Sequence, residues 1–230
     1  MFHWIVVLLL AIPVYGGETL DSVSQSLSKA WSSVNSLSFR TELITTSREN
    51  GVERISKSSS ICNLRREGGK WLVRLEDAAT SLIPSGNVSV RVKSLTVYDG
   101  TTVFLLSQND EAPKTCTRMK VKDNWSDKFD EWKGLQELQS KFQTRWLPDE
   151  TIDGVEAYVL EATKPDSKAV LRYWYDKKSG IFLRLTWQSG DGKLTTEMKR
   201  SRIEINQAID PKEFVFTPPP GVPVEERSFK

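Results

Sequence analysis

Few residues of this 230-residue chain could do acid–base or metal chemistry. The only histidine, His3, lies in an apolar leader that we expect to be removed, so the mature chain would have no imidazole for a triad, a proton shuttle or zinc. The close carboxylate pairs, Glu76 with Asp77 and Asp149 with Glu150, fall at strand ends or loops, where solvated turn residues are the simpler interpretation. We therefore expect no catalytic residue, no metal and no cofactor. A carboxylate enzyme remains the alternative.

The chain has two cysteines, Cys62 and Cys116. In an oxidising compartment an even pair is typical of one disulfide. Two buried free thiols are equally compatible with the sequence, because a disulfide needs the two Cα atoms within about 7 Å of each other.

The amino terminus has the features of a signal peptide. An apolar run from Trp4 to Val14 is shorter than the roughly 20 residues that span a bilayer, and small residues follow at Gly16 and Gly17. We predict a signal peptide over residues 1–16 and a single soluble periplasmic domain over residues 17–230. An uncleaved anchor is the alternative, because no Lys or Arg precedes the apolar run.

Charge is balanced along the whole chain. The 32 basic and 30 acidic residues give a net charge of +2, and no basic block is present that could follow a phosphate backbone. This pattern argues against nucleic acid as a partner.

Two segments have the spacing of amphipathic helices. Leu27 and Trp31 belong to an apolar series over residues 20–34, which Thr19 could cap. A second series extends from Trp125 to Trp146, where Ser126 could cap a long helix and Pro148 would end it.

The rest of the chain alternates apolar and polar residues with the period of a β-strand. Turn residues such as Asp99-Gly100 separate the alternating runs. The predicted strands form an antiparallel meander: 37–44, 55–64, 70–75, 87–97, 102–107, 117–121, 157–162, 170–175, 182–188 and 194–205.

One face of such a sheet is apolar and needs a cover, which only the two amphipathic helices can provide. The predicted fold class is mainly β with α: an incomplete antiparallel β-barrel, in the form of a strongly curved sheet, covered by amphipathic lid helices.

The carboxy-terminal stretch from Asn206 to Val224 follows the pattern Asn-x-x-[Ile/Val]-Asp-x-x-x-Phe-x-Phe-x-Pro-Pro-x-Gly-Val-x-Val. It resembles the ending of the LolA family of outer-membrane lipoprotein carriers. The segments 27–39 and 97–103 agree with the same family in order. The resemblance implies a periplasmic carrier, or chaperone, which holds lipoprotein acyl chains in a hydrophobic cavity under a helical lid and delivers them toward the outer membrane.

The apolar inner positions of the sheet would form the lipid-binding cavity, and aromatic and apolar helix positions would form the lid. The predicted cavity residues are Trp71, Val73, Leu75, Val90, Val92, Leu171, Tyr173, Leu183, Leu185 and Trp187, and the predicted lid residues are Leu27, Trp31, Trp132, Phe142 and Trp146. The alternative is that the same residues pack as a closed core without a ligand.

The resemblance also implies a lid latch. In the carriers, an arginine of a basic pair on an early strand bonds to the lid of the empty cavity, and Arg66 of the pair Arg65-Arg66 matches it. Glu67 stands where the family usually has proline. Two exposed basic residues at a strand end are the alternative.

The partners implied by the resemblance are acylated lipoproteins, an inner-membrane release complex and an outer-membrane receptor. We expect a monomer. A periplasmic lipid- or lipoprotein-sensing or interaction module of the same fold is the alternative function.

Overall fold

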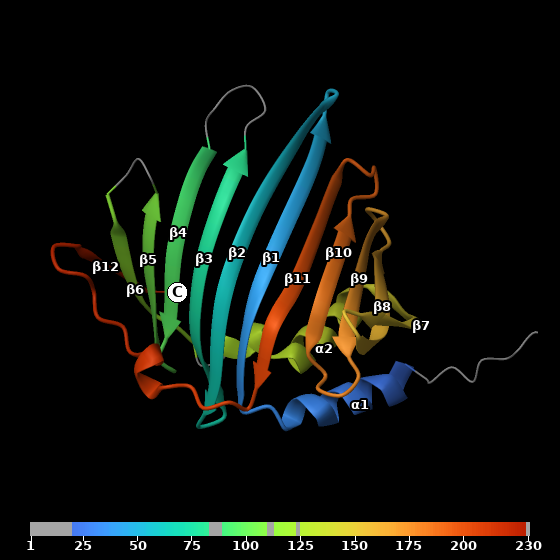
Figure 1. Ribbon diagram of the computed structural model, residues 1–230, viewed down its shortest axis with the longest axis horizontal. Coiled ribbons are helices and arrows are strands. Elements are labelled where there is room, and N and C mark those ends of the chain that lie inside the picture. The colour runs from blue at the N-terminus through green and yellow to red at the C-terminus, as the bar shows by residue number, and fades with distance from the viewer. Residues whose placement is uncertain (1–19, 83–88, 110–112, 123–124, 229–230) are drawn as a thin grey trace, which may run out of the picture.

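The computed structural model describes residues 20–82, 89–109, 113–122 and 125–228 (Figure 1). The strands form a single twelve-stranded sheet in the order β12-β6-β5-β4-β3-β2-β1-β11-β10-β9-β8-β7. Every neighbouring pair is antiparallel except β12 with β6. The sheet curls but leaves β12 and β7 as free edges, so the predicted incomplete barrel is confirmed.

Two meanders make up this sheet, and the pairing of β1 with β11 joins them. The strands are β1 (Ser36–Glu49), β2 (Val52–Glu67), β3 (Lys70–Leu82), β4 (Ser89–Tyr98), β5 (Thr102–Asn109), β6 (Thr115–Lys120), β7 (Gln143–Ile152), β8 (Val155–Lys164), β9 (Ala169–Asp176), β10 (Phe182–Gln188), β11 (Leu194–Ile205) and β12 (Val224–Ser228).

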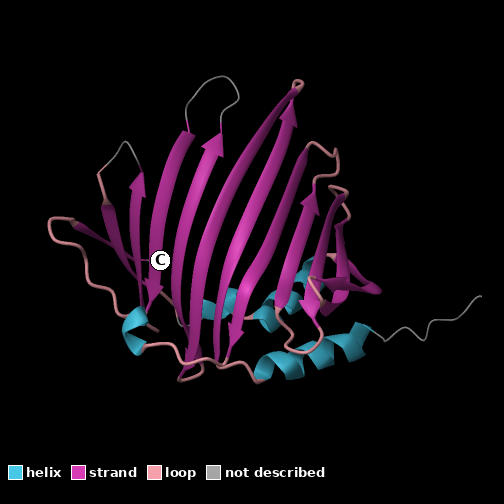
Figure 2. Ribbon diagram, in the orientation of Figure 1, coloured by secondary structure: helices cyan, strands magenta, loops and turns pink. Residues whose placement is uncertain are grey.

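The helices are α1 (Leu20–Ser32), η1 (Trp125–Phe129), α2 (Glu131–Lys141) and η2 (Pro211–Phe214). Figure 2 shows α2 behind the sheet and α1 along the lower ends of the strands. Both helices pack in one buried cluster with residues of the sheet. We call the side that packs against α1 and α2 the helix face and the opposite side the outer face. The predicted signal peptide and the predicted cap Thr19 lie outside the described residues.

The predicted long helix over residues 125–146 was wrong. Asp130 is the amino-terminal cap of α2 and its carboxylate accepts a hydrogen bond from the backbone of Lys133, while the predicted cap Ser126 lies inside η1. At the other end, Phe142 has an extended backbone as the carboxy-terminal cap. The chain then continues as β7, where Trp146 pairs with Leu160 of β8. Trp146 is therefore a sheet residue and not part of the lid helix.

Three groups of buried apolar side chains stabilise the sheet. The Trp71 cluster and the Leu160 cluster lie on the helix face, and the Trp174 cluster lies on the outer face. The buried members are, in the Trp71 cluster, Trp31, Val34, Leu37, Phe39, Cys62, Leu64, Trp71, Val73, Tyr98, Val103 and Ile181; in the Leu160 cluster, Val23, Leu27, Leu135, Leu138, Leu160, Ala162, Tyr175 and Phe182; and in the Trp174 cluster, Ala157, Val159, Trp174 and Leu183.

Of the two alternatives for the cysteines, the structure has the second: Cys62 and Cys116 are free, buried thiols. Cys62 lies on β2 and Cys116 on β6, which are four strand positions apart in the sheet. At the usual spacing of about 4.8 Å this separation is about 19 Å along the sheet, well beyond the reach of a disulfide. Both side chains are buried.

We expect both thiols to resist a thiol reagent in the native protein at pH 8 and to react in denaturant without prior reduction. Burial raises the pKa of Cys62 to about 12, and Arg200, which lowers it, does not compensate. Burial also raises the pKa of Cys116. Counting thiols with a chromogenic disulfide reagent, with and without guanidinium, checks this; a denatured chain that reacts only after reduction would contradict the free-thiol assignment.

Candidate functional site

The interior between the helices and the sheet is apolar and contains two of the three buried clusters of the described residues. α1 contributes Leu27 and Trp31, and α2 contributes Leu135 and Leu138. Trp132 of α2 packs against both the Trp71 cluster and the Leu160 cluster. The two helices thus cover an apolar face that the sheet alone would leave exposed to water.

Most of the predicted cavity residues meet in this interior. Trp71 and Val73 are buried in the Trp71 cluster, and Leu75 packs against it. Three further predicted cavity residues pack at the edge of the Leu160 cluster: Leu171, Tyr173 and Leu185. The predicted lid residue Phe142 packs against the same cluster.

The structure places three predicted cavity residues elsewhere. Leu183 lies in the Trp174 cluster on the outer face, because the β9–β10 register shifts between Phe182 and Arg184. Val92 is exposed, near the start of β4 and away from the helices (Figure 1). Trp187 is half-buried and belongs to no cluster of the described part of the chain. The side chain of Val90 lies outside the described residues.

Several interior residues escaped the sequence analysis. Tyr98 is fully buried at the end of β4, where its hydroxyl donates to the carbonyl of Gly100 over 2.8 Å. Tyr175 and Phe182 flank the β9–β10 turn and pack in the Leu160 cluster. The sequence shows the alternation of apolar residues in these two strands. It does not show which of the turns the helices would cover.

The interior is closed in this structure. The gap bounded by Trp31, Trp132, Leu135 and Tyr175 leaves no space for a water molecule. A crevice of about 270 Å³ opens beside the carboxy-terminal end of α2, between Leu138, Phe142 and Tyr173. Ordinary ligand pockets measure about 300–1,000 Å³, so a long apolar ligand could enter only if α2 moved.

Asp130, the cap of α2, connects this helix to α1 and the sheet. The Trp31 indole donates to one carboxylate oxygen over 3.0 Å, and Arg66 Nη2 lies 3.8 Å from the other. The Arg66 guanidinium also covers the Trp71 ring at 4.5 Å. The proposed latch residue therefore contacts the amino-terminal end of the lid helix in the closed state.

A second arginine contact holds the same end of α2 and was not anticipated. Arg200 of β11 forms a 2.5 Å ion pair with Glu131, the first residue of α2, and both side chains are largely buried. The Arg200 guanidinium lies between the rings of Phe39 and Phe182, at 4.1 and 4.6 Å. Sequence reasoning gave no signal for this pair, because Arg200 is one of many polar residues in an alternating strand.

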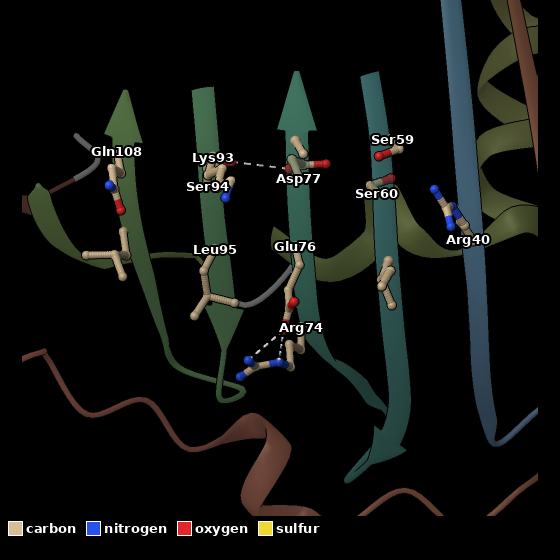
Figure 3. A pocket seen from close by; sticks show the side chains of 13 residues that line it. Arg40, Ser59, Ser60, Arg74, Glu76, Asp77, Lys93, Ser94, Leu95 and Gln108 are labelled. Carbon is tan, nitrogen blue, oxygen red and sulfur yellow. Dashed lines mark hydrogen bonds and ion pairs between the residues drawn. The ribbon is translucent and has the colours of Figure 1, made fainter. Parts of the chain in front are cut away.

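The outer face carries a groove of about 430 Å³ across β2 to β5 (Figure 3). Its lining mixes charged residues such as Arg74 and Glu76 with apolar ones such as Ile61 and Leu95. Arg74 pairs with Glu76 at 2.6 Å and with Glu213 at 3.2 Å, so its charge is already compensated. None of the predicted cavity residues lines this groove.

Glu161 is the buried carboxylate of the outer face, with a side chain only 8% exposed. Burial alone would raise its pKa, but hydrogen bonds from Arg145 and Arg172 outweigh this effect, and the pKa of Glu161 lies below its ordinary value. The carboxylate is therefore a structural ion-pair partner for two guanidinium groups.

We expect Glu161→Gln to lower the melting temperature at neutral pH but not in acid. A carboxylate whose pKa is depressed by folding stabilises the protein above its unfolded pKa, and this stabilisation is lost as the pH falls through the folded pKa. Melting curves of both proteins between about pH 7 and pH 3 should converge at the acid end. A difference in melting temperature that stays constant with pH would contradict the lowered pKa of Glu161.

Among the described residues no group of three or more His, Cys, Asp or Glu side chains could hold a metal ion. In the same part of the chain, no helix has the length and apolar character needed to cross a membrane.

No family model and no curated protein matches this chain. Among the solved structures similar to it, an uncharacterized conserved protein from Thermus thermophilus is 11% identical, with 91% of this chain and 100% of that chain covered and a TM-score of 0.46. MucB in the MucA/MucB complex of Pseudomonas aeruginosa is 17% identical, with 85% of this chain and 61% of that chain covered and a TM-score of 0.44. An outer membrane lipoprotein-sorting protein domain from Vibrio parahaemolyticus is 13% identical, with 84% of this chain and 94% of that chain covered and a TM-score of 0.30. This chain thus spans about three fifths of MucB. At these identities the likeness concerns the fold only.

Proposed function

We propose that this protein is a periplasmic carrier that binds the acyl chains of lipoproteins between its helices and its sheet and delivers them toward the outer membrane. The observation that carries the proposal is the apolar interior under α1 and α2, whose cover is fastened by polar contacts at one end of α2 and flanked by a crevice at the other. The carboxy-terminal pattern that resembles the lipoprotein carriers supports the choice of cargo.

The physical need for such a carrier follows from the hydrophobic effect. Each methylene buried is worth about 0.8 kcal/mol, so an acyl chain of about sixteen carbons left in water costs on the order of 10 kcal/mol. A carrier must offer a comparable apolar surface without exposing it when empty. A helical lid that packs on the empty interior meets both needs.

Loading and release then require only movement of the lid. When α2 moves away from the sheet, Trp132, Leu135 and Leu138 can contact an acyl chain instead of the sheet clusters. A receptor with a better apolar site takes the chain by relative affinity, and no bond is made or broken in the protein. The function therefore needs no catalytic residue.

Native mass spectrometry of the mature protein purified from a periplasmic extract, combined with lipid extraction, tests the proposal. We expect acylated peptide or lipid in about a one-to-one ratio with the protein. A lipid-free protein that also fails to bind a hydrophobic dye would identify the interior as ordinary core and reject the carrier. Bound lipid without transferable lipoprotein would favour the sensing module instead.

A further inference from the structure

Arg200 separates the two apolar clusters of the interior. Its guanidinium touches Phe39, a member of the Trp71 cluster, on one side and Phe182, a member of the Leu160 cluster, on the other. The Arg200 side chain is only 14% exposed. A cation is therefore embedded in the middle of the surface that an acyl chain would occupy.

The only carboxylate paired with Arg200 in the described part of the chain belongs to the lid. Glu131 is the first residue of α2, and its own side chain is 11% exposed. If α2 moves to admit a ligand, Glu131 moves with it and Arg200 keeps only a 3.4 Å contact with the carbonyl oxygen of Phe182. An unpaired buried charge costs several kcal/mol in an apolar surrounding, so the open state needs a replacement anion.

Other donors of the same interior also await acceptors. Within the described residues, the interior has three buried donors without a hydrogen-bond partner: Arg200 Nε and the indole nitrogens of Trp71 and Trp146. Arg40 Nε and Arg184 Nε on the outer face are unpaired as well. Trp71 is 3% exposed and belongs to the same cluster as Phe39, which Arg200 covers. The unmet hydrogen-bonding capacity of these groups is entirely of donors, which calls for a ligand rich in oxygen acceptors.

We propose that the cavity binds an amphiphile whose anionic head group, a carboxylate or a phosphate, replaces the Glu131 carboxylate on Arg200 while its acyl chain lies along the two clusters. This inference rests on the proposed acyl-binding function and extends its ligands from lipoprotein acyl chains, whose ester and amide linkages carry no charge, to anionic amphiphiles. The guanidinium can form paired hydrogen bonds with either oxyanion. The lid and the ligand thus compete for one cation, which couples head-group binding to lid opening.

Fluorescence titration of the mature protein with cis-parinaric acid and with its uncharged methyl ester tests the inference. We expect the wild type to bind the acid at least about tenfold more tightly than the ester, because a charge-assisted hydrogen bond is gained only with the acid. Arg200→Met should reduce the ratio of acid affinity to ester affinity from about tenfold to about one. Glu131→Gln, which removes the competing carboxylate and keeps its shape, should raise affinity for the acid.

The outcomes separate this inference from the proposed function. Equal binding of acid and ester in the wild type, unaffected by Arg200→Met, would overturn the anion site and leave the acyl cavity standing. Failure of both probes to bind would reject the cavity and the anion site together.

Arg184→Met is the matched control. Arg184 lies on the outer face, where its guanidinium covers the Trp174 ring at 5.0 Å and pairs with Glu197 at 2.8 Å. Its replacement removes the same kind of aromatic-stacked cation from the opposite side of the sheet and should preserve the preference for the acid.

If Arg200→Met does not fold, the gain in acid affinity expected from Glu131→Gln still decides the question. Competition by oleate and by dioleoylphosphatidylglycerol then tells a carboxylate from a phosphate head group.

Discussion

Replacing Trp132 with aspartate is expected to reduce acyl binding by at least about tenfold while lowering the melting temperature only modestly. Trp132 is half-buried on α2 and packs against both helix-face clusters, so in the open lid it would face the bound chain. A carboxylate at this position can reach water in the empty protein, whereas a bound acyl chain would surround it with apolar groups. Dye and fatty-acyl titrations, together with thermal melting, measure the two effects separately.

Gln136→Asp is the control for this substitution. Gln136 is an exposed residue of the same helix, so the variant adds the same charge to α2 on its solvent side. We expect wild-type binding from it. If Trp132→Asp loses binding and stability in equal measure, Trp132 is a core residue and the cavity interpretation is wrong.

Leu160→Ala is expected to destabilise the fold by about 2–5 kcal/mol. Leu160 is completely buried on β8, in the cluster that joins the sheet to both helices. Removing its methyl groups loses transfer free energy and leaves a cavity that β8, which is paired on both sides, cannot easily collapse to fill. Urea unfolding at constant slope measures the change in the free energy of unfolding.

Val155→Ala provides the comparison on the same strand. Val155 begins β8 and is 36% exposed, so its truncation should cost well under about 1 kcal/mol. A similar cost for both variants would mean that the Leu160 cluster is loosely packed. If Leu160→Ala loses stability but binds acyl ligands as tightly as the wild type, the Leu160 cluster is part of the scaffold. The ligand would then contact only the Trp71 cluster.

In the described part of the chain, the ion pairs between α2 and the sheet lie at the amino-terminal end of the helix, and a hydrogen bond from Gln139 to Ser24 joins its carboxy-terminal half to α1. Asp130 and Glu131 are adjacent, and they engage Arg66 of β2 and Arg200 of β11, respectively. The other end of α2 has an exposed Lys141 and borders the crevice at Phe142. Under the proposed carrier function, a ligand would therefore enter at the carboxy-terminal end of α2, and the ion pairs at the amino-terminal end would separate afterwards.

Most of the strands could be predicted from local sequence, because a half-buried sheet requires alternation of apolar and polar residues and turns require particular residues. The predicted bounds 182–188 and 194–205 coincide with those of β10 and β11. The turn at Asp99-Gly100 is also as predicted, with Gly100 at φ 98° and the Asp99 carboxylate accepting from the backbone of Thr101 and Thr102. These features depend on short stretches of chain.

The remaining features depend on contacts between segments that are distant in the sequence. Phe142 and Trp146 fit both a helical stripe and a strand, and pairing of residues 143–152 with β8 settled the choice in favour of β7. The cysteines are separated because β3, β4 and β5 lie between their strands, an order that composition does not encode. Arg200 is buried because Phe39, Phe182 and Glu131 converge on it from three distant segments. Pairing, strand order and burial of a charge are properties of long-range contacts, and periodicity within one segment carries no information about them.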